Sequence, residues 1–306
     1  MSARNSYNDG RPAAGCHDGL SAEAIRAGIA RARAPGRADP PVVVLRAAKS
    51  TNDEAKLLAA GGAPHGSLVV AGSQSEGRGQ RGRGFFSPPG AGLYMSAILR
   101  PGVQAASAVH ITAAAAVAVC RAVEGLTGFS PSIKWVNDVY LHGKKVCGIL
   151  TESAVEPGAG PAAEPVFANN CGSLLYAVVG IGINVSARAE DFPPGLRGVA
   201  GSIYPDGRPP ITRNALAAAV MGSLLDLCGA EGLASRGFMG EYRRRSCVVG
   251  REIEYVRGGV RGAGTAEGID DCGRLLVRAA GAAGPVALDA GEVTITCSRA
   301  HLDQHI

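Results

Sequence analysis

Hydrophobic and polar positions along the chain follow two patterns, which predict short strands interleaved with helices. Apolar runs bounded by glycine, proline or polar turn residues indicate strands, at residues 42–45, 67–72, 92–99, 132–135, 146–153 and 174–185. Longer segments with helical periodicity or rich in alanine indicate helices, at residues 21–34, 50–60, 104–124, 213–233 and 236–245. This order predicts an α+β fold, with a mixed or antiparallel sheet flanked by helices.

Composition changes twice along the chain and divides it into three parts. Residues 1–40 are rich in Gly, Pro, Ala and Arg, which indicates a loosely ordered extension around one helix with Ser21 as its N-cap. Residues 41–246 form the main domain, and the Pro/Gly/Ala-rich stretch 155–165 within it indicates a surface loop. Residues 247–306 contain five short strand-like pieces, which predict a small β-barrel.

The length of the apolar runs, the net charge and the N-terminal composition narrow the class of protein. We expect no apolar run to reach the roughly 18 residues that a membrane span needs, and therefore no membrane insertion. The formal net charge of +5 over 306 residues is spread along the chain, and we expect no nucleic-acid partner. The first 20 residues lack the apolar core of a signal peptide, which favours the cytoplasm. The Arg- and Ala-rich stretch 26–37 leaves a mitochondrial location open.

The cysteines and the histidine of the long helix are expected to be structural. The eight cysteines form no C-x-x-C pair and have mostly apolar neighbours, so we expect them to be reduced. They are Cys16, Cys120, Cys147, Cys171, Cys228, Cys247, Cys272 and Cys297. His110 lies within an apolar helix and is interpreted as a core histidine.

The first segment with chemical potential is the Gly- and Arg-rich loop Gly77–Gly84. It lies between two strands and lacks the Gly-Lys-Ser/Thr ending of a P-loop. Its four glycines allow close approach to an anion, and its three arginines supply donors to phosphate or carboxylate oxygens. A phosphate-binding loop and a solvated hairpin loop both fit this composition.

The second segment is Lys134-Trp135-Val136-Asn137-Asp138, followed by Lys145. A tight turn at His142-Gly143 predicts a hairpin that brings Asp138 near Lys145. Asp138 is then placed to hold a metal ion, although lysines and carboxylates also occur at hairpins without function. The third segment is Gly180-Ile181-Gly182-Ile183-Asn184, whose glycines indicate close approach of a ligand or another backbone. Asn184 is either a functional polar group or a turn residue at the end of the strand.

The three segments, taken together with others, resemble the biotin protein ligase family in order and spacing across residues 42–297. Each motif is short and weak by itself, whereas the joint order is specific. The matching residues are Ser50-Thr51-Asn52, Gln74, Gly77 to Arg83, Ser87-Pro88, Gly92-Leu93-Tyr94, Lys134 to Asp138, Gly143-Lys144-Lys145, Gly148-Ile149-Leu150 and Gly180 to Asn184. Three positions depart from the family pattern: Val136 replaces proline, Gln80 replaces arginine, and Phe85 or Phe86 replaces tryptophan.

The resemblance implies a catalytic domain similar to class II aminoacyl-tRNA synthetases, followed by a small SH3-like β-barrel. It also implies activation of biotin by ATP with Mg²⁺ to biotinyl-5′-AMP, and then transfer to a lysine of a biotin carboxyl carrier domain of a carboxylase. The implied catalytic residues are Lys145 and Arg78, and the implied metal ligands are Asp138 and Asn184. The implied substrate-binding residues are Ser50, Thr51, Asn52, Gln74, Gly77, Arg78, Gly79, Gln80, Arg81, Arg83, Phe85, Lys134, Trp135, Asn137, Lys145, Gly148, Ile149, Gly182 and Asn184.

Two alternative functions are considered. A lipoate or octanoyl transferase would share the fold, and the resemblance implies that the loop Gly77–Gly84 favours biotin. A biotin-sensing regulator would need a DNA-binding winged helix, for which residues 1–40 are too short and irregular. A homodimer remains open.

Overall fold

The computed structural model describes residues 18–33, 39–155, 172–279, 281–282, 284–289 and 291–295. Its helices are α1 (Ala22–Ala32), α2 (Thr51–Ala60), α3 (Ala108–Thr127), α4 (Arg213–Leu227), α5 (Ala230–Ser235) and α6 (Phe238–Arg244). The strands of the main domain are β1 (Val42–Leu45), β2 (Leu68–Ala71), β3 (Gly92–Leu99), β4 (Ser132–Lys134), β5 (Asp138–Leu141), β6 (Lys144–Val155) and β7 (Leu174–Asn184). The remaining strands are β8 (Glu252–Arg257), β9 (Val260–Ile269), β10 (Leu275–Arg278), β11 (Val286–Leu288) and β12 (Glu292–Ile295).

The main domain is built on one seven-stranded mixed sheet. Its order is β1-β2-β3-β7-β6-β5-β4. Only β1 and β2 pair in parallel, and the other neighbours are antiparallel. The expected mixed sheet is therefore confirmed.

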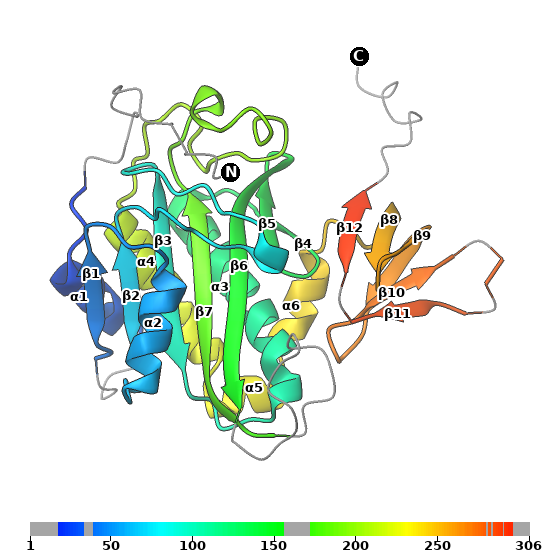
Figure 1. Ribbon diagram of the computed structural model, residues 1–306, viewed down its shortest axis with the longest axis horizontal. Helices are drawn as coiled ribbons and strands as arrows, with labels where there is room; N and C mark the ends of the chain where they lie inside the picture. The colour runs from blue at the N-terminus through cyan, green and yellow to red at the C-terminus, as the bar shows by residue number, and fades with distance from the viewer. Residues whose placement is uncertain are drawn as a thin grey trace, which may run out of the picture.

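Helices cover both faces of this sheet (Figure 1). Helix α2 packs on one face, where Ala55 and Ala59 contact Val69, Ile98 and Val178. The other face carries the larger core, to which α1, α3 and α4 contribute most of their buried side chains. Because α2 is short, it leaves the rest of its face uncovered, and the candidate site lies there.

Helix α3 departs from the expectation about apolar length. Together with the preceding 3₁₀ turn it forms a segment, Ala105–Thr127, that is long and apolar enough to cross a membrane, with a mean hydropathy of 1.6. However, 78% of its most apolar 18-residue stretch is buried inside the structure. Its composition therefore matches that of a core helix, since its small alanine side chains allow close packing against the sheet and α4.

The C-terminal strands form a separate antiparallel sheet in the order β11-β10-β9-β8-β12. The expected small antiparallel unit is confirmed, but within the described residues β11 and β12 remain edges, so hydrogen bonds do not close it into a barrel. Hydrogen bonds attach it to the main domain: Trp135 Nε1 donates to Gly273 O at 2.9 Å, Arg243 Nε donates to Ile269 O at 2.7 Å, and His110 Nε2 lies 2.8 Å from Asp271 O. His110 is buried, as expected of a core histidine.

Residues 18–33 differ from the expected loose extension. Helix α1 begins after Ser21, whose side chain accepts a hydrogen bond from Ala24 N, as predicted. Its Ile25 and Ile29 are fully buried in the main core. Asp18 anchors the segment, because its carboxylate pairs with the buried Arg213 (Nε to Oδ1, 2.9 Å) at the start of α4. The helix is thus part of the main domain.

Three smaller differences concern the helices and strands. The helix expected at 213–233 is broken between α4 and α5 at Cys228-Gly229, and β5 forms a strand of its own. The expected surface loop at 155–165 lies almost entirely outside the described residues, as do residues 1–17. Within the described part of the chain, the cysteines at 120, 147, 228, 247 and 272 are free thiols, as expected.

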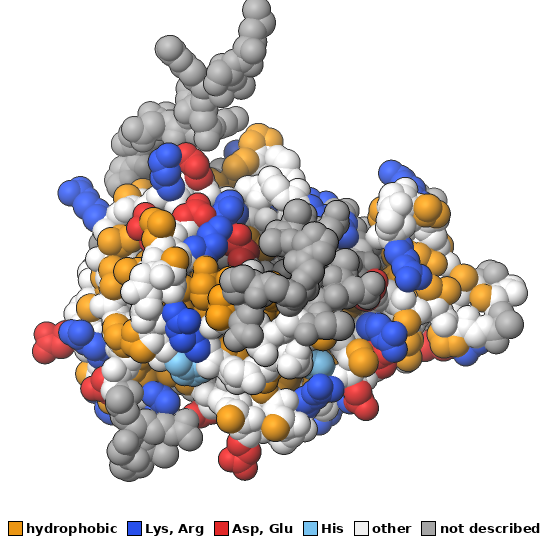
Figure 2. Space-filling model, turned by 60° about the horizontal axis from the view of Figure 1, so that its bottom comes forward, with side chains coloured by type: hydrophobic (Ala, Val, Ile, Leu, Met, Phe, Trp, Pro, Cys, Tyr) orange, Lys and Arg blue, Asp and Glu red, His pale blue; other side chains and the backbone are white. Residues whose placement is uncertain are grey.

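Charged side chains are dispersed over the face seen in Figure 2. Lysine and arginine side chains alternate there with acidic and apolar ones and form no single continuous patch.

The buried ion pair Asp18–Arg213 generates a stability prediction. Asp18→Ala should lower the free energy of unfolding by about 3 kcal/mol, because Arg213 would keep a buried charge without its carboxylate. Urea denaturation measures this change. The double variant Asp18→Ala/Arg213→Leu should recover part of the loss. A change below about 0.5 kcal/mol for Asp18→Ala would contradict the anchoring role.

Candidate functional site

One cavity of about 320 Å³ lies on the sheet face beside α2. This volume is at the lower end of the range for small-molecule sites. All the predicted site residues except Gly77 line it, although they come from distant parts of the chain. The structure thus gathers the three predicted segments in one place, while the role of each residue stays a prediction.

Gly77, at the start of the Gly- and Arg-rich loop, does not line the cavity. A methyl group on it would lie 2.6 Å from Phe85 O and 2.7 Å from Ser87 Oγ. Its carbonyl accepts a hydrogen bond from Phe85 N at 2.8 Å. Gly77 therefore allows the two arms of the loop to approach closely, and this is a structural role.

The hairpin β5–β6 confirms the predicted turn. His142 and Gly143 have φ values of 50° and 71°, as a two-residue hairpin turn of type I′ requires. The pairing then shifts register, so that Asp138 pairs with Gly148 whereas Tyr140 pairs with Lys145. This bulge adds one residue to β6. As a result, Lys145 lies on the same face as Asp138 and Gly148, because residues paired across antiparallel strands share a face.

The charged groups of the hairpin lie close together in the cavity wall. Lys145 Nζ is 2.6 Å from Asp138 Oδ1, which confirms the predicted proximity. Lys134 Nζ lies 5.7 Å from the ring centre of Tyr140. Burial lowers the pKa of Lys134, and the Asp138 carboxylate partly opposes this by raising it. Burial also raises the pKa of Tyr140 to about 12, so its hydroxyl stays protonated at neutral pH.

The floor of the cavity is made of strand glycines. Gly148 of β6 and Gly182 of β7 are paired, and the ring of Phe85 lies over both. A methyl group on Gly182 would lie 2.5 Å from that ring, and one on Gly180 would lie 2.1 Å from Asn52 Oδ1. Close approach is found at these glycines, but the approaching groups are side chains of the same chain, where a ligand or another backbone was expected.

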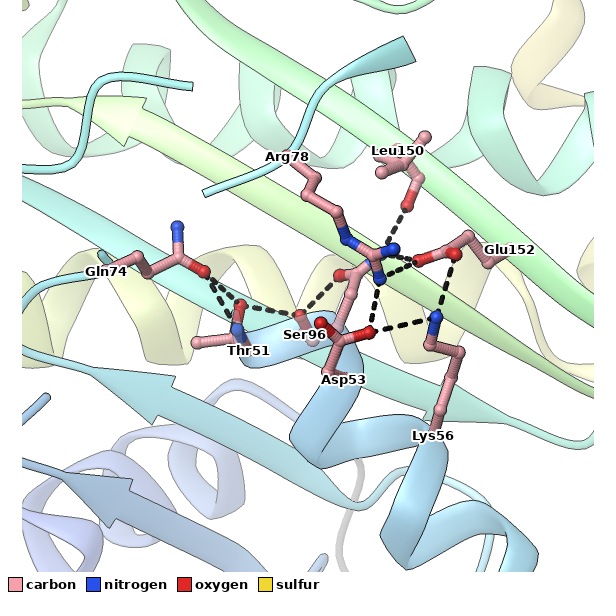
Figure 3. A network of polar contacts seen from close by, with 9 residues as sticks. Thr51, Asp53, Lys56, Gln74, Arg78, Ser96, Leu150 and Glu152 are labelled. Carbon is pink, nitrogen blue, oxygen red and sulfur yellow. Dashed lines mark hydrogen bonds and ion pairs between the residues drawn. The ribbon is translucent and has the colours of Figure 1, made fainter. Parts of the chain in front are cut away.

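The start of α2 is fixed to the floor by hydrogen bonds (Figure 3). Gln74 Oε1 accepts from Thr51 N at 2.8 Å, and Gln74 Nε2 donates to Ser87 Oγ at 2.9 Å. The Ser96 hydroxyl, on β3, donates to Asn52 Oδ1 at 2.6 Å. These contacts hold the helix N-terminus and its polar side chains rigidly at the edge of the cavity.

A second network holds Arg78 through residues that the sequence did not indicate (Figure 3). Arg78 Nη2 is 2.5 Å from Asp53 Oδ1 and 3.2 Å from Glu152 Oε2. Glu152 also accepts from Asn52 Nδ2 at 2.7 Å and from Lys56 Nζ at 3.0 Å. Glu152 therefore connects the Gly/Arg loop to α2. Asp53 and Lys56 lie in an ordinary helix and Glu152 in a strand, so nothing in the sequence marked them.

Two further parts of the cavity wall were also missed. One is the segment after β7, which contributes Phe192, Leu196, Val199 and Ala200, and the other is β12 with the residue before it. Leu196 and Val199 are partly exposed apolar side chains at the cavity. Apolar residues in a Pro/Gly-containing loop are the only available sequence signal, and that signal is weak.

The predicted metal ligands can be tested against the donor set. Within the described residues no group of three or more His, Cys, Asp or Glu side chains gathers to hold an ion. Asp138 is paired with Lys145, and Asn184 Nδ2 donates to Gly201 O at 3.0 Å, which leaves the side-chain oxygen of Asn184 as an acceptor. Mg²⁺ commonly takes one or two carboxylates together with phosphate and water oxygens. These residues therefore fit an ion that is bound together with a nucleotide.

Comparisons with known proteins give the family. The model of the biotin/lipoate A/B protein ligase family matches residues 44–159. The biotin–[acetyl-CoA-carboxylase] ligase of Paracoccus denitrificans is 33% identical over 257 residues, which are 80% of this chain and 96% of that protein. The bifunctional ligase/repressor BirA of Bacillus subtilis is 39% identical over 154 residues, so the matched part spans only 43% of that relative.

Solved structures agree on the fold. The biotin protein ligase from Aquifex aeolicus in complex with biotin and ATP has a TM-score of 0.66 and 21% identity, and the match covers 84% of this chain and 99% of that one. The Leishmania major ligase in complex with biotinyl-5-AMP has a TM-score of 0.53 and 23% identity, and covers 85% of this chain and all of that one. The chain belongs to the biotin protein ligase family.

The glycine floor generates a prediction about packing. Gly180→Ala should lower the free energy of unfolding by about 1–3 kcal/mol, because its methyl group would displace Asn52 and break the hydrogen bonds to Ser96 and Glu152. The matched control is Gly268→Ala in β9, where the added methyl group meets no atom within 4 Å. Thermal unfolding of both variants tests this. Equal melting temperatures for Gly180→Ala and the wild type would contradict the described packing.

Proposed function

We propose that this chain activates biotin with ATP to biotinyl-5′-AMP and then transfers the biotinyl group to a lysine of a biotin carboxyl carrier domain. The observation that carries the proposal is the convergence of Arg78 and Lys145 in one cavity with the polar start of α2. The similarity to the Paracoccus ligase over nearly its full length supports it.

Two cations in one cavity answer the main physical difficulty of the first step. The carboxylate of biotin has to reach the α-phosphorus of ATP, and the two anions repel each other. Positive groups fixed in advance offset this repulsion without reorganisation during the reaction. Arg78 and Lys145 both line the cavity and come from different elements, the Gly/Arg loop and strand β6. They therefore supply this charge where the two reactants meet.

Both cations already have carboxylate partners. Lys145 pairs with Asp138, and Arg78 pairs with Asp53 and Glu152. These partners hold the long side chains near the cavity and limit the entropy lost when an anionic substrate binds. The anionic groups of the substrates then share or replace the carboxylates as partners.

The first step breaks one phosphoanhydride bond of ATP and forms a mixed anhydride between biotin and AMP. A carboxylate oxygen of biotin bonds to the α-phosphorus, and the bond to the bridging oxygen of pyrophosphate breaks. Lys145 stabilises the charge on the α-phosphate, and no side chain acts as a nucleophile. Mg²⁺, held with the nucleotide by Asp138 and Asn184, would neutralise phosphate charge.

The second step uses the same site. The amine of the acceptor lysine bonds to the biotinyl carbonyl carbon, loses a proton, and AMP leaves with the oxygen of the anhydride. Arg78 and Lys145 stabilise the leaving phosphate as they did in the first step. The Gly/Arg loop lies over the cavity and excludes water from the anhydride, which would otherwise hydrolyse.

The direct test uses a purified carrier domain. The protein is mixed with biotin, Mg-ATP and a biotin carboxyl carrier domain, and the carrier is weighed by mass spectrometry. The expected result is a mass increase of one biotinyl group, which depends on ATP and is lost when the target lysine is replaced. Lipoate and octanoate serve as matched alternatives. Modification by either acid in place of biotin would reject biotin as the substrate.

Lys145 should dominate the first step. Lys145→Ala should lower the rate of biotin-dependent pyrophosphate release by roughly 10²–10³-fold, the scale of losing one preorganised charge-stabilising donor. The control is Lys49→Ala, since the Lys49 side chain is 76% exposed and does not line the cavity. A Lys145→Ala rate within a few-fold of wild type would remove this residue from the mechanism.

Arg78 should govern retention of the intermediate. Arg78→Gly removes the ion pairs that connect the loop to α2 and β6, so the loop should close poorly and release biotinyl-AMP into solution. The measurement is the fraction of labelled biotinyl-AMP that stays with the protein on a desalting column. Retention equal to that of the wild type would show that the loop closes without this side chain.

A further inference from the structure

Residues 199–201 lie at the end of the cavity-wall segment that follows β7, and they continue the sheet beyond the end of that strand. Strand β7 ends at Asn184 and pairs with β6 only from Cys147 onward. The start of β6, including Lys145, therefore has no partner in β7. Lys145 N donates to Val199 O at 2.9 Å, and Gly201 N donates to Lys145 O at 2.9 Å. The backbone of Lys145 is thus held between Tyr140 on one side and this segment on the other.

Gly201 packs closely against the start of β6. A methyl group on Gly201 would lie 2.6 Å from Lys144 Cβ. That atom is fixed to the backbone and cannot rotate away, so any larger residue at 201 has to move the segment or the start of β6. Lys144 Nζ also donates to Gly198 O at 2.5 Å, and this hydrogen bond holds the segment against the start of β6.

Asn184 fixes the same segment from the floor of the cavity. Its Nδ2 donates to Gly201 O at 3.0 Å, and its backbone oxygen accepts from Ile203 N at 3.0 Å. All the polar atoms of Gly201 are therefore used: its N–H bonds to Lys145 and its oxygen to Asn184. The hydrogen bonds run without interruption from β7 through Gly201 to Lys145.

We propose that Gly201 is a positioning residue that sets the backbone of Lys145, and with it the placement of the Lys145 amine in the cavity. The inference rests on the proposed function, in which Lys145 stabilises the reacting phosphate. The bulge in β6 turns the Lys145 side chain into the cavity. The backbone hydrogen bonds to residues 199–201 then fix how far its amine reaches into the cavity. Displacing a reacting group by about 1 Å can lower a rate by up to about 10²-fold.

The test compares two glycines of one loop. Gly201→Ala should lower the maximal rate of biotin-dependent pyrophosphate release by about 10-fold or more at saturating biotin and ATP. Biotin KM should change little, because Thr51 and Asn52 at the start of α2 are expected to bind biotin, and the hydrogen bonds that hold them do not involve Gly201. Gly198→Ala is the matched control, since a methyl group there meets no atom within 4 Å, and it should keep the wild-type rate. Equal rates for Gly201→Ala and the wild type would overturn the inference.

A double-variant comparison separates positioning from general damage. In a Lys145→Ala background, Gly201→Ala should cause little further loss, because the group it positions is absent. A further loss as large as that seen with Lys145 present would assign Gly201 a merely structural role.

A second variant removes the contact itself, in case Gly201→Ala folds poorly. Lys144→Gly removes the Cβ atom that the new methyl group would meet, together with the Lys144 Nζ hydrogen bond to Gly198 O, so Lys144→Gly/Gly201→Ala should match Lys144→Gly alone in stability and rate. A further loss as large as that caused by Gly201→Ala in the wild type would contradict the assigned contact. Absence of pyrophosphate release from the wild type would instead reject the proposed function, so the two failures are distinguishable.

Discussion

One extra residue in β6 determines which way Lys145 points. Because side chains alternate between the faces of a strand, regular pairing beyond Asp138 and Gly148 would turn Lys145 toward the core formed with α3. The bulge instead aligns it with Asp138, Tyr140 and the glycine floor. This local change of register places the Lys145 amine in the cavity and its backbone beside residues 199–201.

The rest of the site balances charge against open space. Gly148, Gly180 and Gly182 carry no side chains, and the volume they leave is shared by Asn52, Phe85 and the cavity. Arg78 and Lys145 are each held by carboxylates, because a partly buried cation without a partner would be unfavourable. Both cations therefore have carboxylate partners before any ligand binds. The anionic groups of a substrate can replace these carboxylates as partners with little movement of either side chain.

Much of this could be predicted from local signals. The His142-Gly143 turn predicted the hairpin, and the glycines around Ile181 indicated close approach, although of a ligand or another backbone. The sequence could not indicate contacts between distant, individually ordinary residues. Helix α1 was expected in a loose extension because of its composition. The contact that anchors the segment, between Asp18 and Arg213, joins residues far apart in the chain and leaves no local signal. Glu152 and Gly201 were missed for the same reason: each matters only through its partners in space.

The central claim is that distant cations converge on one cavity that accepts the acid group of biotin. Calorimetric titration of biotin into the purified protein tests this most directly, repeated with Arg78→Gly. The account predicts a saturable heat of binding for the wild type and weaker binding for the variant. Absence of heat from the wild type, or equal binding by both proteins, would contradict it.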